Sequence, residues 1–450
     1  MTKSYLIKNV IIVNEYAQYP GSVFIENGII EKILPKGSPL AAYEYRAIIV
    51  EGNGKHLLPG IIDDQVHFRE PGMEYKADIE SESRAAVVGG VTSYMEMPNN
   101  KPPVVNNALL EEKYKRADGR SYANYSFYLG ATNNNIEEIK NLDIERNCGI
   151  KVFMGSSTGN MLVDDEKALQ NIFSQTPTII ATHCEDENTI KNNLQEAKKE
   201  YKENIPFKMH PKIRSEEACF LSSSKARKLA EQFGTKLHIL HLTTAKEAEN
   251  LISEEDVDKK QITAEVCVHH LWFNDNDYSR KGSFIKWNPA IKTEQDRIAL
   301  IQALLDDRID VIATDHAPHT LEEKKNNYLN APSGGPLIQH SLLMMLEFYH
   351  RGFIPLEKIV QKMAHNPAKL FQVRKRGYIK EGYWADLVLI DLEKETEVKK
   401  ESLHYKCGWS PLEGYTFKSA VTHTFVNGKM VVEEGEIIGK PEGWRLSFNR

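Results

Sequence analysis

Cysteine is sparse in this chain, and long apolar runs are missing. The 450 residues include five cysteines, Cys148, Cys184, Cys219, Cys267 and Cys407, and no two of them form a C-x-x-C pair. This distribution favours neither a disulfide framework nor a cysteine-based zinc site. No apolar run approaches the roughly 20 residues that a membrane span needs, and the N-terminus lacks the layout of a signal peptide. We therefore expect a cytoplasmic protein without a membrane partner.

A strong excess of charge is also absent, as are low-complexity linkers and solenoid repeats. The net charge of −6 argues against a general nucleic-acid or anionic-membrane surface. A hydrophobic content of 41% and a charged content of 27% are those of an ordinary globular protein. The length suits either one large α/β barrel with an appended module or two to three smaller domains.

Both ends of the chain have the pattern of β-strands. Residues 1–57 contain β-branched runs, and the turn-forming pair Asn27-Gly28 separates two of them. β-branched stretches return after about Gly377, with a second such pair at Asn427-Gly428. The sequence predicts a small β-sandwich built from residues 1–57 and 375–450, whose two halves pair with each other.

The middle of the chain alternates apolar runs with amphipathic segments. There are eight such runs, at residues 58–68, 91–97, 125–131, 149–154, 177–182, 236–242, 261–268 and 309–314. Helices are predicted between them, for example at 78–88, which Gly89-Gly90 closes, and at 294–305. Eight strands, each followed by a helix, are typical of a (β/α)8 TIM-type barrel, which we expect over residues 58–374.

The first run ends in polar residues at alternate positions. Asp63, Gln65, His67 and Arg69 would share one face of a strand, because successive side chains point to opposite faces. A histidine and an arginine that face one cavity suit a metal ion and an anion. The alternative is a strand end that happens to be polar.

Other runs also end in polar residues. These residues are Asn99, Lys151, His183, His241, His269, His270, Asp315 and His319. In a barrel the carboxyl ends of the strands meet at one mouth, where the chemistry takes place. His183 could instead be a core histidine. The run Leu-His-Ile-Leu-His contains two histidines, His238 and His241. We assign the ligand role to His241, which is nearer the polar end, and a core role to His238.

Two residues of this set leave alternatives open. Lys151 lies inside an apolar run, where an unpaired ammonium is costly to bury. It either pairs with a carboxylate or has reacted with CO2 to form a carbamate that bridges two metal ions. Asp315 could be a helix N-cap, although the run Asp-His-Ala-Pro-His is hard to explain as a cap.

Together these residues suit metal-assisted hydrolysis. Imidazoles and carboxylates bind zinc, which lowers the pKa of a bound water to roughly 7 and supplies hydroxide at neutral pH. Asp315 could then shuttle a proton from this water to a leaving nitrogen. Arg69, Asn99 and His319 could hold a substrate carboxylate. The chemistry predicted is hydrolysis of an amide or a cyclic amide.

Seven motifs follow the order and spacing of a known family. They are DQVHFREPG, MEMPNN, GIKVFMG, ATHCED, LHILHLTTAKE, KWNPAIKTEQDR and IATDHAPHTLEEK. Over residues 59–336 the chain resembles the dihydroorotases of the amidohydrolase superfamily, whose composite β-sandwich the flanking segments also match. The resemblance implies a small-molecule substrate. The implied reaction is the reversible hydrolysis of L-dihydroorotate to N-carbamoyl-L-aspartate in pyrimidine (UMP) biosynthesis.

The resemblance also assigns roles to individual residues. His67, His183, His241 and Asp315 resemble the zinc ligands of the family, with Asp315 also the proton shuttle and Lys151 the carboxylated bridging lysine. Arg69, Asn99, Asn288 and His319 resemble the substrate-binding residues, and the backbone near Pro332 and Ser333 would close over the ring. Barrel enzymes of this type are often dimers, so a homodimer is expected.

One position departs from the family pattern. The first strand usually carries His-x-His, whereas here the first position is Gln65. An amide oxygen binds zinc more weakly than an imidazole does. Gln65 is therefore either a weak ligand or no ligand, and we expect one or two zinc ions per chain. Lys151, His183 and His241 form the firmer site.

Two other interpretations compete with this one. Hydantoinases and allantoinases share the metal scaffold, but they generally lack the arginine of His-Phe-Arg, so Arg69 and His319 favour a dihydroorotase. A catalytically silent homologue that serves as a binding partner is the other alternative. Gln65 supports it, and the otherwise complete set of ligands opposes it.

Overall fold

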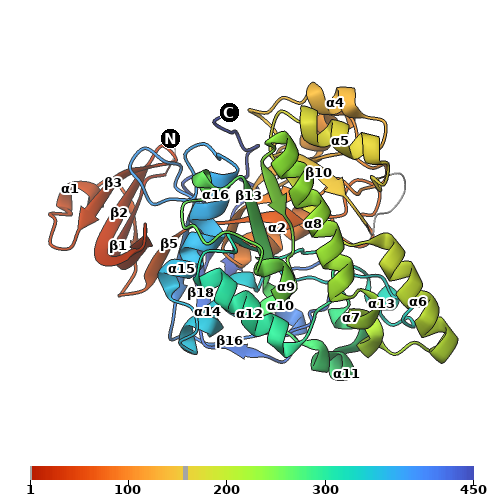
Figure 1. The fold of residues 1–450 in the computed structure, drawn as a ribbon. Coiled ribbons are helices and arrows are strands. Elements are labelled where there is room, and N and C mark those ends of the chain that lie inside the picture. Colours follow the sequence, from red (N-terminus) through yellow and green to blue (C-terminus); the bar gives the residue numbers. More distant parts are fainter. Residues whose placement is uncertain (1–2, 156–160) are drawn as a thin grey trace.

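A parallel barrel forms the centre of the molecule, and a mixed β-sheet lies to one side of it (Figure 1). The computed structural model describes residues 3–155 and 161–450. The barrel strands are β6 (Ile61–Val66), β7 (Val91–Glu96), β8 (Asn124–Phe127), β9 (Leu129–Gly130), β10 (Ile150–Phe153), β11 (Ile180–His183), β12 (Leu237–Ile239), β13 (Ile262–Cys267) and β14 (Val311–Ala313). Each of the eight predicted runs contains or overlaps at least one of these strands. The run 125–131 overlaps two, because β8 and β9 are separated by Tyr128.

The barrel strands pair in parallel in two arcs. One arc has the order β6-β7-β8, and the other runs from β9 through β10, β11, β12 and β13 to β14. A parallel bridge between Val66 and His316 brings the end of β6 beside the segment that follows β14. The predicted (β/α)8 barrel with an appended β module is confirmed.

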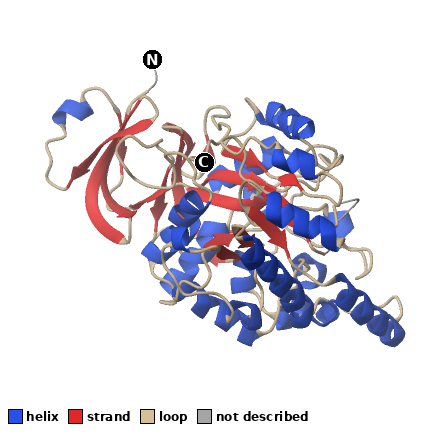
Figure 2. Cartoon of the chain, turned by 45° about the horizontal axis from the view of Figure 1, so that its top comes forward, coloured by secondary structure: helices blue, strands red, loops and turns tan. Residues whose placement is uncertain are grey.

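Helices surround the barrel strands (Figure 2). The longer ones are α2 (Ile79–Val88), α3 (Asn107–Ala117), α5 (Glu166–Gln175), α6 (Glu187–Tyr201), α8 (Glu216–Phe233), α12 (Glu294–Leu305) and α14 (Ser341–His350). The side chain of Asp78 caps α2 by accepting a hydrogen bond of 2.8 Å from the Ser81 amide. Thr293 caps α12 in the same way through Asp296. Both predicted helices are confirmed, with Asp78 as the cap of the first.

The remaining α-helices are short. They are α1 (Ala41–Glu44), α4 (Ile136–Lys140), α7 (His210–Ile213), α9 (Ala245–Ala248), α10 (Val268–Trp272), α11 (Tyr278–Lys281), α13 (Leu321–Lys324), α15 (Leu356–Val360) and α16 (Asn366–Leu370). Several of them, such as α10 and α13, belong to the loops that follow barrel strands. No helix among residues 3–155 and 161–450 is long and apolar enough to cross a membrane.

The two ends of the chain share one nine-stranded sheet. Its strands are β1 (Tyr5–Asn14), β2 (Ala17–Glu26), β3 (Ile29–Pro35), β4 (Ile48–Glu51), β5 (His56–Pro59), β15 (Leu387–Asp391), β18 (Ala420–Val426), β19 (Lys429–Glu433) and β20 (Glu436–Ile437). β5 pairs with β1 in parallel and with β15 in antiparallel orientation, so it joins the two ends. A single residue, Gly60, then leads from β5 into β6, and this ties the sheet to the first barrel strand.

Candidate active site

A cavity of about 320 Å³ opens at the carboxyl ends of the barrel strands. Its lining comprises Gln65, His67, Arg69, Asn99, Lys151, Phe153, His183, His241, Trp287, Asn288, Asp315, Ala317, His319, Pro332, Ser333 and Gly334. Every residue that the sequence singled out as a metal ligand, catalytic group or substrate-binding group is in this set. The structure therefore brings them together, while the role of each stays a prediction.

The backbone turns sharply where several of these side chains enter the cavity. Arg69, His241 and Asp315 have φ angles of 71°, 39° and 45°, in the left-handed region that residues with a side chain rarely adopt. Each lies just after a barrel strand, at a point where the chain leaves the sheet. Such strain persists only where the surrounding structure imposes it, and it is concentrated at functional sites.

His183 and His241 form one side of the cavity. His183 Nδ1 lies 2.9 Å from His241 Nε2, and both side chains are buried. Burial lowers the pKa of each imidazole, and most strongly that of His241. Neutral imidazole is the form that binds a metal ion. The two nitrogens are thus placed to bind a common ion.

Behind His183 stands a carboxylate that orients its ring. Glu185 Oε2 accepts a hydrogen bond of 3.0 Å from His183 Nε2 and also pairs with Arg214. Burial raises the pKa of Glu185, but Arg214 and His183 lower it further, to about 2. This ionised carboxylate keeps the proton of His183 on Nε2 and leaves Nδ1 free toward the cavity. Sequence reasoning missed Glu185 as a supporting residue, although its place two residues after His183 could have identified it.

His67 and Asp315 form the opposite side. His67 Nδ1 donates to Asn99 Oδ1 at 2.8 Å, and His67 Nε2 lies 3.0 Å from Asp315 Oδ1. Nδ1 carries the proton of the neutral His67 ring in this arrangement, so the lone pair of Nε2 faces the carboxylate of Asp315. The same arrangement is found when an imidazole and a carboxylate bind one cation. Gln65 Nε2 is 3.4 Å from the same Asp315 oxygen. The Gln65 amide therefore lies beside Asp315 in the cavity.

Lys151, on β10, also lines the cavity. Its side chain is 1% exposed, and its Nζ is 4.7 Å from the centre of the Phe153 ring. No ion pair or hydrogen bond of its ammonium is found within residues 3–155 and 161–450. Burial lowers the pKa of Lys151 to about 8. Among the described residues, no carboxylate lies at ion-pair distance from Lys151, so the first alternative that the sequence left open, pairing with a carboxylate, is not seen there.

The third region of the cavity can hold an anion. The Nε of Arg69 donates to Pro318 O at 3.0 Å, and its Nη2 lies 3.0 Å from His319 Nε2. Lys76 Nζ is 3.0 Å from His319 Nδ1 and 2.8 Å from a Glu323 oxygen. Burial, followed by the charge of Arg69, lowers the pKa of His319 well below its usual value. Lys76 is a second residue that sequence reasoning missed, and no motif pointed to it.

A short loop closes this end of the cavity. Gly334 has a φ of 125°, and a Cβ there would lie 2.5 Å from Ala317 O, so no other residue fits the position. The buried Lys324 donates to Pro332 O at 2.9 Å and to Gly334 O at 2.7 Å. These bonds hold the segment whose residues Pro332 and Ser333 line the cavity wall.

Not every polar residue of the first strand faces the cavity. The alternation predicted a common direction for Asp63, Gln65, His67 and Arg69, but the carboxylate of Asp63 accepts a hydrogen bond of 2.6 Å from Thr314 Oγ1 instead. The register of β6 against β7 shifts between Asp63 and Val66. Such an irregularity breaks the two-residue alternation, so the prediction was wrong for Asp63.

The remaining strand-end histidines are packed in the protein. His269 stacks on Trp287 with ring centres 4.3 Å apart, and His270 Nε2 contacts Pro289 O at 3.2 Å. His316 Nε2 bonds to Glu82 at 2.7 Å. His238 is fully buried below the cavity, in agreement with the core position expected for it.

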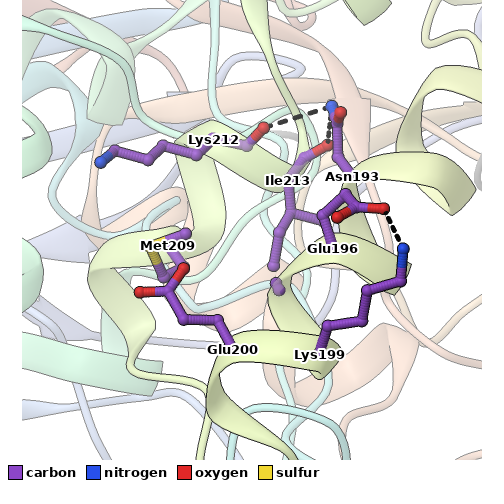
Figure 3. Close-up of a pocket in the computed structure, with 8 residues that line it drawn as sticks. Asn193, Glu196, Lys199, Glu200, Met209, Lys212 and Ile213 are labelled. Atoms are coloured by element: carbon purple, nitrogen blue, oxygen red, sulfur yellow. Dashed lines mark hydrogen bonds and ion pairs between the residues drawn. The ribbon is translucent and has the colours of Figure 1, made fainter.

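A second hollow lies on the outer surface between α6 and α7 (Figure 3). Two of its charged side chains pair with each other, and one amide side chain is bonded to backbone. Glu196 pairs with Lys199 at 2.6 Å, and Asn193 Nδ2 donates to Ile213 O at 3.1 Å. No histidine or cysteine is among its lining residues. It therefore does not compete with the barrel mouth as a catalytic site.

Comparison with known proteins identifies the family of this chain. Residues 56–431 match the model of the amidohydrolase family. A dihydroorotase of Pyrococcus furiosus is 34% identical over 427 residues, which are 95% of this chain and 92% of that protein. A dihydroorotase of Methanothermobacter thermautotrophicus is 31% identical over 392 residues, covering 86% of this chain and 87% of the relative.

Solved structures show the same fold. An L-hydantoinase from Arthrobacter aurescens superposes with a TM-score of 0.92 at 24% identity, covering 99% of this chain and 100% of that one. A D-hydantoinase from a Thermus species gives a TM-score of 0.87 at 23% identity, covering 98% of this chain and 99% of that one. The family resemblance seen in the seven motifs is confirmed: the chain belongs to the amidohydrolase family, in the group of cyclic-amide hydrolases that includes the dihydroorotases.

Proposed function

We propose that this protein is a zinc-dependent dihydroorotase. One observation carries the proposal: a single cavity joins a set of metal-binding side chains to a guanidinium and an imidazole that can hold a carboxylate. Cyclic amides without a carboxylate need no such anion site. The names of the relatives at 31–34% identity support the same substrate.

The donor set fits zinc. His183 Nδ1 and His241 Nε2 are neutral and 2.9 Å apart, and His67 Nε2 and Asp315 Oδ1 are 3.0 Å apart. In the same cavity an unmodified ammonium would repel a metal ion, whereas a carbamate on Lys151 would help to hold one. We therefore propose that Lys151 is carboxylated. When bound, zinc activates a water molecule and polarises the carbonyl group of the substrate.

The residues of the chain supply the rest of the chemistry. Asp315 accepts a proton from the attacking water as the new C–O bond forms, and delivers it to the ring nitrogen as the C–N bond breaks. Arg69 and His319 hold the substrate carboxylate, and Asn99 and Asn288 contact the ring. The Asn288 Oδ1 atom is buried without a hydrogen-bond partner among the described residues, so it can accept a ring N–H.

The pathway, the cellular location and the oligomeric state belong to the same proposal. The reaction places the protein in pyrimidine biosynthesis, in the cytoplasm, and the family resemblance suggests a homodimer. The division into residues 1–57, 58–374 and 375–450 also stays a prediction. Size-exclusion chromatography with light scattering would decide the oligomeric state.

Replacing Arg69 tests the carboxylate site. Arg69→Ala is expected to raise KM for dihydroorotate by roughly 10- to 100-fold, because a hydrogen bond to a charged group contributes about 1.5–3 kcal/mol. The zinc content should not change, since Arg69 is not among the proposed ligands. Steady-state kinetics with dihydroorotate, together with zinc analysis of the same sample, measure both quantities.

The control for this variant is Arg308→Ala. Arg308 pairs with Asp306 at 2.8 Å in the loop before β14, and it does not line the cavity. Its KM should equal that of the wild type. An unchanged KM in Arg69→Ala would remove the role assigned to Arg69. Turnover of hydantoin or allantoin in preference to dihydroorotate would overturn the proposed substrate.

The departure at position 65 gives a further prediction. Gln65→His is expected to tighten the binding of a metal ion beside His67 and Asp315, on the order of tenfold or more, because imidazole is a better zinc donor than an amide. Zinc retained per chain after dialysis against a weak chelator measures the change. The shorter amide in Gln65→Asn serves as the control. If retention is equal in all three proteins, position 65 makes no contact with the metal.

A further inference from the structure

Three buried polar side chains meet in the barrel interior, outside the lining of the mouth. They are Asp64 on β6, His238 on β12 and Glu265 on β13, and each has an exposed fraction of 0%. One ligand atom from each lies within 4.8 Å of those of the other two. The cluster is separate from the set that lines the catalytic cavity.

The distances in this cluster are long for an ion pair. His238 Nε2 lies 3.2 Å from Asp64 Oδ2 and 3.5 Å from Glu265 Oε2, whereas charge-assisted hydrogen bonds are usually about 2.7–2.9 Å. Among the described residues, both Asp64 oxygens, Glu265 Oε2 and His238 Nε2 lack a hydrogen-bond partner. Ligands around one ion at about 2.1 Å are roughly 3.0–3.4 Å apart, which is close to the spacing seen.

The surroundings fix how the histidine faces the two acids. Thr263 Oγ1 donates to Leu237 O at 3.3 Å, so it accepts at 2.8 Å from His238 Nδ1. The lone pair of the neutral imidazole is then on Nε2, directed at Asp64 and Glu265. A supporting partner of this kind on the second ring nitrogen is typical of a histidine that binds a metal.

The charges favour a positive charge at the same point, carried either by a proton or by a metal ion. Two carboxylates with no exposure and an imidazole lone pair repel one another, and isolated buried charges are costly. A proton on His238 would offset one of the two negative charges, and a divalent ion offsets both. Imidazole together with carboxylates suits Zn²⁺ or Mn²⁺ better than Mg²⁺ or Ca²⁺.

We propose that Asp64, His238 and Glu265 bind a divalent transition-metal ion beneath the catalytic centre. The ion is distinct from the zinc proposed at the mouth. Glu265 connects the two levels, because its Oε1 accepts a hydrogen bond of 2.9 Å from the backbone N–H of His241. Through this bond the lower ion supports the left-handed turn that directs His241 into the cavity.

Anomalous diffraction from wild-type crystals tests the site directly. Crystals of protein loaded with Zn²⁺, and separately with Mn²⁺, are measured above and below the absorption edge of the metal. The expected map has a peak among Asp64, His238 and Glu265, in addition to any peak at the mouth. Maps without a peak at this cluster for both metals overturn the proposal. In that case a proton, and not a metal ion, occupies the cluster. Burial lowers the pKa of His238, but the two carboxylates outweigh this effect and raise it to about 9.

Metal analysis of matched variants gives an independent test. Asp64→Asn keeps the size of the side chain, and it should lose one metal ion per chain relative to the wild type. Asp63→Asn changes the adjacent buried carboxylate, which bonds to Thr314 rather than to the cluster, and it should keep the wild-type content. Equal metal content in wild type and a folded Asp64→Asn, as judged by circular dichroism, contradicts the proposal. If Asp64→Asn does not fold, the same metal analysis is made on Glu265→Gln. The diffraction test uses the wild-type protein and needs no variant.

Discussion

Asp315→Asn is expected to lower kcat for dihydroorotate hydrolysis by roughly 10²- to 10⁴-fold, the usual contribution of a general acid–base group. The amide keeps the size of the side chain and can still contact His67, whose Nε2 lies 3.0 Å from Asp315 Oδ1. It cannot accept a proton from water or return one to the leaving nitrogen. Rate constants at saturating substrate, measured in both directions of the reaction, test this expectation.

Zinc content and a matched variant separate proton transfer from other effects of this change. Asp310→Asn alters another buried aspartate, which pairs with Lys260 at 2.6 Å and does not line the cavity. It should lose about 3–5 kcal/mol of stability, the usual cost of breaking a buried ion pair, while the folded protein keeps its kcat. If Asp315→Asn contains wild-type zinc and retains a kcat within a factor of a few, Asp315 is not the proton shuttle.

Replacement of Lys151 should have an effect at least as large. Lys151→Ala is expected to lose roughly 10³-fold or more of kcat, because a bridging ligand supports a metal contribution of several kcal/mol, and each 1.36 kcal/mol is a factor of ten. Lys151→Arg should be equally inactive, since a guanidinium cannot form the carbamate. Kinetics and zinc analysis of the two variants measure both effects.

Two further measurements distinguish a carbamate from a simple cation at position 151. Short carboxylic acids added to Lys151→Ala should restore part of the activity, because they place a carboxylate where the carbamate would be. The intact mass of the wild type under neutral conditions should exceed the sequence mass by one CO2. If Lys151→Arg is active, or if acids do not restore Lys151→Ala and the added mass is missing, Lys151 acts as the free amine.

Much of the fold was predictable because its signals are local. The apolar run at 149–154 corresponds to β10, and Thr293 with Asp296 marks the start of α12 at the residue predicted. Parallel strands alternating with helices allow few arrangements, so the closed barrel follows from the order of the runs. The convergence of His183, His241 and Asp315 was predictable for the same reason, since the carboxyl ends of barrel strands meet.

Other features depend on contacts between distant residues and left no local signal. Arg214 pairs with Glu185 across 29 positions, and Lys76 reaches His319 across 243. The direction of Asp63 depends on an irregular register between β6 and β7, which the alternation of the sequence does not reveal. Hydrogen bonds and ion pairs of this kind act over a few ångströms in space, whatever the separation along the chain.

The sequence by itself determined the barrel, the appended β module and the residues that gather at its mouth, because hydrophobic periodicity and the order of the motifs specify them. Only the tertiary structure decided which nitrogen of His183 and of His67 faces the cavity, that Lys151 is buried with no ion pair among the described residues, and that Asp64, His238 and Glu265 meet. These properties depend on burial and on distances between side chains from different strands. They exist only after the strands have closed into the barrel.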